Sequence, residues 1–215
     1  MNYVIVGLGN PGDEYTNTRH NTGFLALDAI FKKLADENVG DSADWQFDKK
    51  INAYTAKIQL KNAKGKVGKH ECVLIKPQTF MNKSGGSLSK LITSAKKAEQ
   101  LIVIHDDLDQ PIGNVKAVFN RGSGGHRGIE SITKTIKTEG YYRIKVGISP
   151  ATAGGKIKKP LGEEAVEKNI LGDFRPTEKD VLKKVFKKII EGVEVLGEYD
   201  GQLAKDKMIQ VVNTK

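Results

Sequence analysis

The chain has 215 residues, of which 38% are hydrophobic and 28% are charged, and these fractions exclude intrinsic disorder as the default. The length predicts one well-buried domain, or at most two small ones. There is no apolar run long enough for a membrane span, no signal peptide and a single cysteine, Cys72. We therefore expect a cytoplasmic protein without membrane contact or disulfides.

Charge is unevenly distributed along the chain. The net charge is +9, yet residues 1–48 carry three basic and eight acidic side chains, whereas residues 49–215 carry 32 and 18. Such a basic excess indicates a polyanionic partner, most simply nucleic acid. A solubilising lysine surface explains the charge equally well, so charge alone does not decide.

The first part of the chain predicts a strand, a helix and a hairpin. A short apolar run indicates a buried strand at 3–8, and apolar residues at helical spacing indicate a helix over about 22–35. Two further strands, at 53–60 and 71–75, flank the lysine- and glycine-rich segment 62–69. This pattern is typical of an antiparallel hairpin with a basic tip.

The middle of the chain alternates helices and strands. We expect a helix after Ser84, a short buried strand at 101–104 and a strand at 115–119. A further helix follows the glycine-rich segment 122–128. The apolar face of the helix after Ser84 consists of Leu88, Leu91, Ile92 and Ala95.

The last part predicts a strand at 142–148, a mobile loop at 150–160 and a long helix from near Thr177, with Asp180 placed for a capping pair. The lysines of this helix lie mostly away from its apolar face, which favours docking on the core over membrane binding. The whole pattern predicts an α/β fold in a single domain, 1–215, with a twisted mixed β-sheet flanked by helices.

Polar side chains follow three of the predicted strands. Asn10 follows the first strand, Asn82 lies beyond the strand at 71–75, and His105 and Asp106 follow the strand at 101–104. The carboxyl ends of strands in an α/β sheet converge on one crevice. We therefore expect these side chains at one rim, together with His20 ahead of the first helix.

This set of side chains suits hydrolysis by an activated water. A histidine accepts a proton from water near neutral pH, a carboxylate on its other ring nitrogen fixes the tautomer, and asparagine amides stabilise the developing oxyanion. No G-x-S-x-G elbow supplies a serine nucleophile. Each residue also has an ordinary alternative role, as a hydrogen-bonding group at a turn or a helix terminus.

Two other kinds of site are less consistent with the sequence. Residues 105–109 contain one histidine and three aspartates, but no H-x-x-x-H spacing is present and we expect no metal. Gly7, Gly9 and Gly12 complete a G-x-G-x-x-G after a strand. A polar run follows them, and no second strand is expected before about residue 53, so a dinucleotide-binding unit is excluded.

The glycine-rich segment 122–128 opens a helix, so its backbone N–H groups suit a phosphate. A structural glycine turn is the alternative. We expect a basic track for nucleic acid beside it, formed by His126, Arg127, Lys116, Arg143 and Lys145.

Four sequence blocks stand out together: VGLGNPGDEYTNTRHNTGF, KPQTFMNKSGGS, HDDLDQPIG and GSGGHRG. In their order and spacing the chain closely resembles the bacterial-type peptidyl-tRNA hydrolases over essentially its whole length. The resemblance implies a monomeric esterase, without metal or cofactor, that cleaves the bond between a nascent peptide and its tRNA.

The resemblance also implies roles for single residues. His20 would activate water, Asp106 would stabilise its working form, and Asn10 would help to discriminate N-blocked peptidyl-tRNA from aminoacyl-tRNA. The resemblance also places Asn82, Tyr15 and Phe80 at the substrate. Two further contacts are expected from sequence position alone: Met81, which lies beside Asn82 as an apolar wall or else in the core, and Asn21, in the same polar loop as His20.

One residue departs from the family pattern. Arg127 stands where many members have asparagine, and a donor-only guanidinium predicts a phosphate contact instead. A second reading also stays open, because plant-organelle splicing factors similar to this family bind RNA without the hydrolase role. An active enzyme is favoured over this inactive RNA-binding alternative by the full set of Asn10, His20, Asn82 and Asp106.

Overall fold

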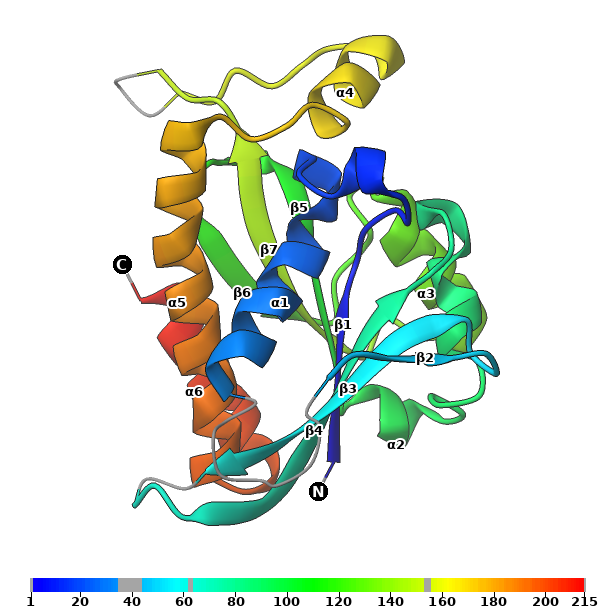
Figure 1. The fold of residues 1–215 in the computed structure, drawn as a ribbon, viewed down its shortest axis with the longest axis vertical. Coiled ribbons are helices and arrows are strands. Elements are labelled where there is room, and N and C mark those ends of the chain that lie inside the picture. The colour runs from blue at the N-terminus through cyan, green and yellow to red at the C-terminus, as the bar shows by residue number, and fades with distance from the viewer. Residues whose placement is uncertain (1, 35–43, 62–63, 153–155, 215) are drawn as a thin grey trace.

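One sheet forms the centre of the fold, and its strands are β1 (Asn2–Gly7), β2 (Gln46–Asp48), β3 (Ala53–Lys61), β4 (Val67–Pro77), β5 (Leu101–Pro111), β6 (Val115–Phe119) and β7 (Tyr142–Ser149). The computed structural model describes residues 2–34, 44–61, 64–152 and 156–214. The strand order is β2-β3-β4-β1-β5-β7-β6 (Figure 1). Strands β4, β1, β5 and β7 run parallel, and antiparallel strands extend the sheet on both sides.

Helices cover both faces of this sheet. They are α1 (Thr22–Leu34), α2 (Ala95–Ala98), α3 (Arg127–Ile136), α4 (Glu163–Ile170), α5 (Pro176–Glu198) and α6 (Gly201–Asn213), with 3-10 helices η1 (Asp13–Tyr15), η2 (Arg19–Asn21) and η3 (Met81–Leu88). Helices α1, α5 and α6 pack on one face, and α3 with η3 packs on the other. Figure 1 shows α4 beyond the ends of β5 and β7. The predicted α/β fold with a mixed sheet is confirmed.

The strands contribute to two cores by side-chain alternation. In β1, Tyr3 and Ile5 belong to the core on the α1 side, whereas Val6 belongs to the core on the α3 side. All three are fully buried. A strand covered on both faces has no polar alternation, which explains why its sequence is a continuous apolar run.

The glycines of the first motif bring β1 against α1. A Cβ on Gly7 would lie 2.3 Å from the carbonyl oxygen of Gly23, and a Cβ on Gly23 would lie 2.2 Å from the backbone nitrogen of Leu8. A loop carrying η1 and η2 separates Gly7 from α1, and Gly23 is a residue of the first turn of α1. Both glycines serve backbone packing, in agreement with the exclusion of a dinucleotide fingerprint.

Strand β5 is longer than predicted, and this difference creates the site. β5 pairs with β1 only as far as Ile104, opposite Gly7, but continues along β7 to Pro111. The expectation that the strand ends at Ile104 is therefore wrong. Asp106 lies within β5, beyond the end of β1, where one edge of the strand has no neighbour in the sheet.

The predicted helix after Ser84 is also wrong. Residues 81–88 form η3, and the next α-helix, α2, has only 4 residues. Gly85 lies against α3, where a Cβ would be 2.2 Å from the carbonyl oxygen of Ser131. This close approach requires glycine, and glycine disfavours a continuous α-helix. Leu88 and Ile92 are nevertheless buried.

The start of α5 differs from the predicted capping pair. The helix begins with Pro176, and the backbone N–H of Arg175 donates to Glu178 at 2.8 Å, so Thr177 and Asp180 do not form the cap. The sequence pattern also does not predict β2, α4 or α6. Residues 62–63 of the predicted hairpin tip and 153–155 of the predicted mobile loop lie outside the described residues.

Candidate active site

A cavity of about 460 Å³ opens where the chain leaves β1 and β4 and where β5 extends past β1. Its wall includes residues from segments far apart in the sequence, as the predicted convergence of strand ends requires. The predicted site residues that line it are Asn10, Tyr15, His20, Phe80, Met81, Asn82, Asp106, His126, Arg127 and Lys145.

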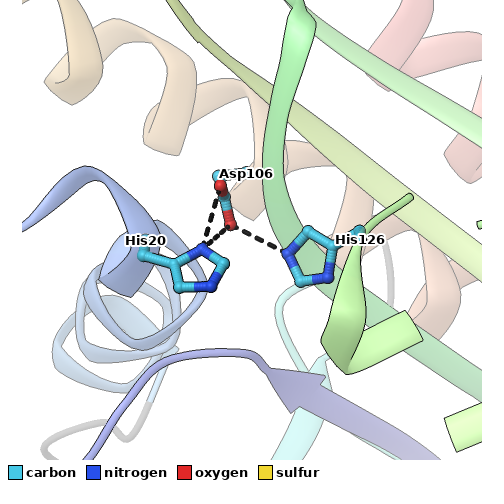
Figure 2. A group of neighbouring side chains, drawn as sticks. All are labelled: His20, Asp106 and His126. Atoms are coloured by element: carbon cyan, nitrogen blue, oxygen red, sulfur yellow. Dashed lines mark hydrogen bonds and ion pairs between the residues drawn. The ribbon is translucent and has the colours of Figure 1, made fainter. Parts of the chain in front are cut away.

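His20 and Asp106 line the part of this cavity that we call its floor, and Figure 2 shows their side chains facing each other. Nδ1 of His20 lies 3.0 and 3.1 Å from the two carboxylate oxygens of Asp106. An ionised carboxylate only accepts, so Nδ1 donates and the lone pair of neutral His20 is on Nε2. Within the described residues Nε2 makes no hydrogen bond, which leaves it available to take a proton.

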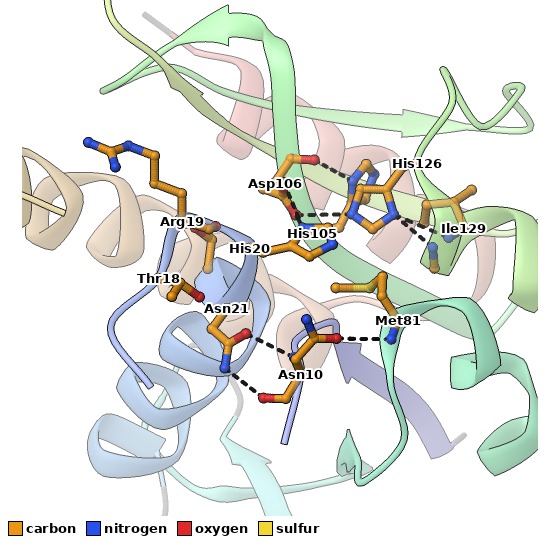
Figure 3. Close-up of polar contacts among 12 residues, drawn as sticks. Asn10, Thr18, Arg19, His20, Asn21, Met81, His105, Asp106, His126 and Ile129 are labelled. Carbon is orange, nitrogen blue, oxygen red and sulfur yellow. Dashed lines mark hydrogen bonds and ion pairs between the residues drawn. The ribbon is translucent and has the colours of Figure 1, made fainter. Parts of the chain in front are cut away.

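His126 bonds the same carboxylate and caps α3 (Figure 3). Its Nδ1 accepts the backbone N–H groups of Gly128 at 3.1 Å and Ile129 at 3.3 Å, and its Nε2 lies 3.0 Å from Oδ1 of Asp106. Because Nδ1 accepts, the ring proton of neutral His126 is on Nε2 and is donated to Asp106. The start of α3 thus fixes the tautomer of a second histidine.

Burial and charge oppose each other at this floor. Burial raises the pKa of Asp106, but the charges and hydrogen bonds of His20 and His126 outweigh it and hold the pKa below its ordinary value. Burial lowers the pKa of His20, but the charge and hydrogen bond of Asp106 raise it above its ordinary value. Asp106 is therefore ionised, and His20 is a stronger base than a free imidazole.

The hydrogen bonds of His126 also bear on metal binding. His20, Asp106 and His126 each offer a ligand atom, and these atoms lie within 4.8 Å of one another. Coordination through Nε2 of His126 would require an imidazolate or the loss of the α3 cap, because Nδ1 already accepts two backbone N–H groups. With these hydrogen bonds in place, Nε2 of His126 carries a proton and has no lone pair for a metal ion.

Asn10 is held by hydrogen bonds on its backbone and its side chain. Its N–H donates to Oδ1 of Asn21 at 2.8 Å, and its carbonyl accepts from Nδ2 of Asn21 at 2.9 Å. Oδ1 of Asn10 accepts the Met81 N–H at 2.9 Å. Its amide nitrogen remains for a ligand, and Figure 3 shows this nitrogen on the side of His20.

Asn21 does not lie where the expected substrate contact requires, whereas Met81 is in the cavity wall. Asn21 is only 2% exposed and lies outside the cavity wall, so its place is behind Asn10 as a support. Met81 does line the cavity, but it is buried and its backbone N–H is used to orient Asn10.

Aromatic and amide groups line the outer wall. Phe80 is 58% exposed and lines the cavity, so its ring offers a surface on which a base or an apolar side chain can stack. Tyr15 and Asn82 line the same cavity. The side chain of Asn82 forms no hydrogen bond with the described part of the chain, which leaves its amide for a ligand.

His105 is structural in this arrangement. It is buried, and its Nδ1 donates to the carbonyl oxygen of Asp106 at 2.7 Å. Burial, followed by the neighbouring charge of His126, lowers the pKa of His105 to about 3. Its ring packs edge-on against His126, with centroids 4.7 Å apart. His105 stays neutral. It supports Asp106, which bonds His20, and His126, which bonds Asp106.

Ion pairs surround the cavity rim. They join Asp107 to Lys145 (2.9 Å), Asp109 to Lys159 (2.5 Å) and Arg127 to Glu163 (2.5 Å). The last pair is the most exposed, with side-chain exposures of 66% and 80%. The guanidinium of Arg127, for which we predict a phosphate contact, is thus matched to a carboxylate of α4.

The predicted basic track is only partly formed. Lys116 is exposed and lies opposite Lys145 in the β6–β7 register. Arg143 is 1% exposed and donates to the carbonyl oxygens of Arg121 and Gly122, so the expectation that it contacts RNA is wrong. Its side chain turns inward and holds the start of the glycine-rich loop.

Two features of the site have no counterpart in the sequence analysis. The guanidinium of Arg19, next to His20, donates to the carbonyl oxygens of Gly172 and Asp173 at 3.1 and 2.8 Å and pairs with Glu178 at 2.8 Å. The second feature is the wall contributed by α4. Both depend on contacts between segments about 150 residues apart, for which local sequence holds no signal.

Comparison with known proteins identifies the family. A sequence model described as peptidyl-tRNA hydrolase matches residues 4–215. The chain belongs to the peptidyl-tRNA hydrolase family. It is 38% identical to the peptidyl-tRNA hydrolase of Aquifex aeolicus over 87% of this chain and 85% of that one. It is 32% identical to that of Halalkalibacterium halodurans, over 98% of both chains.

Solved structures of the peptidyl-tRNA hydrolase family share the fold. The peptidyl-tRNA hydrolase of Acinetobacter baumannii superposes with a TM-score of 0.78 at 26% sequence identity, covering 99% of this chain and 94% of that one. The structural similarity therefore covers the whole sheet and the helices on both of its faces. Among the described residues, no helix has the length and apolar character needed to cross a membrane.

Proposed function

We propose that this member of the peptidyl-tRNA hydrolase family cleaves the carboxylic ester between an N-blocked peptide and the 3′ end of tRNA. The observation that carries the proposal is the pairing of His20 with Asp106 on the floor of a cavity that also presents the Asn10 amide. The substrate is inferred from membership of the peptidyl-tRNA hydrolase family, and the reaction mechanism is inferred from the positions of these side chains.

In the proposed reaction, Nε2 of His20 removes a proton from water as the water oxygen attacks the ester carbonyl carbon. Asp106 stabilises the resulting imidazolium through Nδ1. The amide N–H groups of Asn10 and Asn82 donate to the carbonyl oxygen as negative charge develops on it. When the tetrahedral intermediate collapses, the bond to the ribose oxygen breaks and His20 returns its proton to that oxygen.

The tRNA part of the substrate is proposed to lie along the basic side of the cavity. Lys145 lines the cavity, and Lys116 extends the positive charge along the next strand. Gly124 and Gly125 have φ of 63° and 81°, so the loop before α3 needs glycine, and the backbone N–H groups of Gly125, Gly128 and Ile129 are bonded to the side chains of Ser123 and His126. The exposed guanidinium of Arg127, beside this loop, is the proposed donor to the phosphates of the 3′ end.

The test is release of N-acetyl-amino acid from N-acetyl-aminoacyl-tRNA by the wild type and by His20→Ala. We expect turnover by the wild type and a loss of at least about 10²–10⁴-fold in the variant, because general-base catalysis contributes on this order. Equal rates in both proteins would remove His20 from the mechanism. Tight tRNA binding without turnover by the wild type would favour an inactive RNA-binding homologue.

A further inference from the structure

Helix α4 presents one side to the active-site cavity. The residues of α4 and its C-cap that line the cavity are Glu163, Val166, Glu167, Ile170 and Leu171. They recur at intervals of three and four, which places them on one face of the helix. No residue of α4 is buried, so this face, with its three apolar and two acidic side chains, is only partly covered by the protein itself.

The face runs outward from the catalytic floor. Gly172, just beyond α4, is bonded to the backbone N–H and the guanidinium of Arg19, the neighbour of His20. The end of α4 with Ile170 and Leu171 is therefore next to the catalytic histidine. With a rise of about 1.5 Å per residue, Glu167 lies about 4.5–6 Å further along the axis than Ile170 and Leu171.

The two carboxylates on this face differ in their ion-pair partners. Glu163 is paired with Arg127 at 2.5 Å. Glu167 also lines the cavity, but its side chain forms no ion pair within the described part of the chain. The basic groups of the cavity, Arg127, Lys145 and Lys159, lie on other segments and are themselves matched to carboxylates. Glu167 is thus the acidic group left for a cationic ligand.

We infer that this face of α4 receives the peptide side chain next to the ester, and that Glu167 makes the site favour a side chain with a long apolar stem and a positively charged tip. This inference rests on the proposed function and specifies its substrate class. The stem of a lysine packs on Ile170, Leu171 and Val166, and its ammonium reaches the Glu167 carboxylate. The phosphates of tRNA bind the basic groups of the cavity, which lie on other segments than α4.

The experiment changes only the tip charge of the peptide side chain. Nα-acetyl-lysyl-tRNA, its Nε-acetylated form and its Nε-succinylated form share one tRNA and one alkyl stem, but carry positive, neutral and negative tips. We expect the wild type to give the highest kcat/KM for the positive tip, about two- to five-fold above the neutral one, and the lowest for the negative tip. In Glu167→Gln the preference for the positive tip should disappear, and in Glu167→Lys it should reverse.

Glu164→Gln is the matched control, since Glu164 is on the same helix and exposed but does not line the cavity. It should retain the wild-type order. Equal kcat/KM for the three wild-type substrates, or the same loss of preference in Glu164→Gln, would overturn the inference while leaving the hydrolase intact. Failure to hydrolyse any of the three would instead count against the proposed function.

Discussion

The floor and the rim of the cavity are built in different ways. At the floor, His20, Asp106 and Asn10 are at most 9% exposed and the side chain of His126 is 9% exposed. Hydrogen bonds of 2.8–3.3 Å join these residues to one another, to Asn21 or to the backbone. At the rim, Arg127 and Glu163 are exposed and share a single ion pair.

This difference suits the floor to the proposed chemical step and the rim to the proposed binding of substrate. Buried, multiply bonded groups hold one geometry before substrate arrives, which is what electrostatic preorganisation requires. An exposed ion pair is worth only about 0–1 kcal/mol, so a phosphate or a cationic side chain can replace one partner at little cost. Substitutions at the floor should therefore lower kcat at any salt concentration. Substitutions at the rim should change the affinity for tRNA, and this change should become smaller as the salt concentration rises.

The largest effect is expected for Asp106→Asn. Loss of the carboxylate should lower kcat by roughly 10²–10⁴-fold, because His20 loses its tautomer and the charge that stabilises its protonated form. The same change removes the cause that raises the pKa of His20. Since activity requires neutral His20, the acid limb of the kcat/KM profile should move to lower pH, while the residual rate falls.

A pH–rate profile of wild type and variant between pH 5 and 9 measures both effects. An acid limb that stays in place would mean that Asp106 does not set the protonation of His20. A limb that moves to higher pH would reverse the assigned roles.

A smaller effect is expected at His126, where two substitutions separate its two functions. His126→Asn keeps a side chain that can cap α3 but removes the donor to Asp106, so kcat should fall about tenfold with thermal stability near wild type. His126→Phe removes both functions and should also lower the unfolding free energy by about 0.5–2 kcal/mol. Thermal unfolding and kcat of the two variants form the comparison. If Asn restored full activity, the bond to Asp106 would have no catalytic role.

The smallest effect is expected at the rim, for Arg127→Ala. It should weaken tRNA binding by a few-fold and reduce the slope of log K against log salt by about 0.7–0.9, with kcat unchanged. Glu163→Gln frees the guanidinium and should strengthen binding at low salt. An unchanged slope in Arg127→Ala would rule out the proposed phosphate contact.

Arg143→Met supplies the reference for that experiment. Because the Arg143 guanidinium is buried against carbonyl groups of the glycine-rich loop, its loss should cost about 1–3 kcal/mol of unfolding free energy and leave the salt slope unchanged. Denaturant unfolding measures the first quantity. A smaller slope of log K against log salt in this variant would mean that Arg143 does contact the phosphates of tRNA.

Features that depend on local sequence could be predicted, and features that depend on distant contacts could not. The run at 3–8 and the helix at 22–35 follow from apolar periodicity, and α1 does begin at Thr22. Residues 81–88 form a 3-10 helix because Gly85 must approach α3, a constraint that is invisible in the segment itself. The extension of β5 depends on β7, about 40 residues later.

The same distinction applies to the site. Asn10 and His20 belong to one polar loop, so their nearness to the strand ends follows from the order of elements. By contrast, Asn21 and Arg143 are polar, and their positions in the sequence predict contacts with the ligand. In the fold, Asn21 hydrogen-bonds to Asn10 and Arg143 hydrogen-bonds to the carbonyl oxygen of Gly122. Sequence pattern identifies polar residues near a site, whereas only tertiary structure tells which of their atoms are already bonded.

The capping of α3 by His126 has a consequence for heat inactivation. The first turn of a helix is where fraying begins, and here the residue that closes that turn also bonds the carboxylate of Asp106. Opening this one turn would release a donor from Asp106 without unfolding the sheet. Catalytic activity should then be lost on warming at a lower temperature than the bulk of the secondary structure, reversibly so, and substrate that lies over the start of α3 should narrow the gap between the two temperatures.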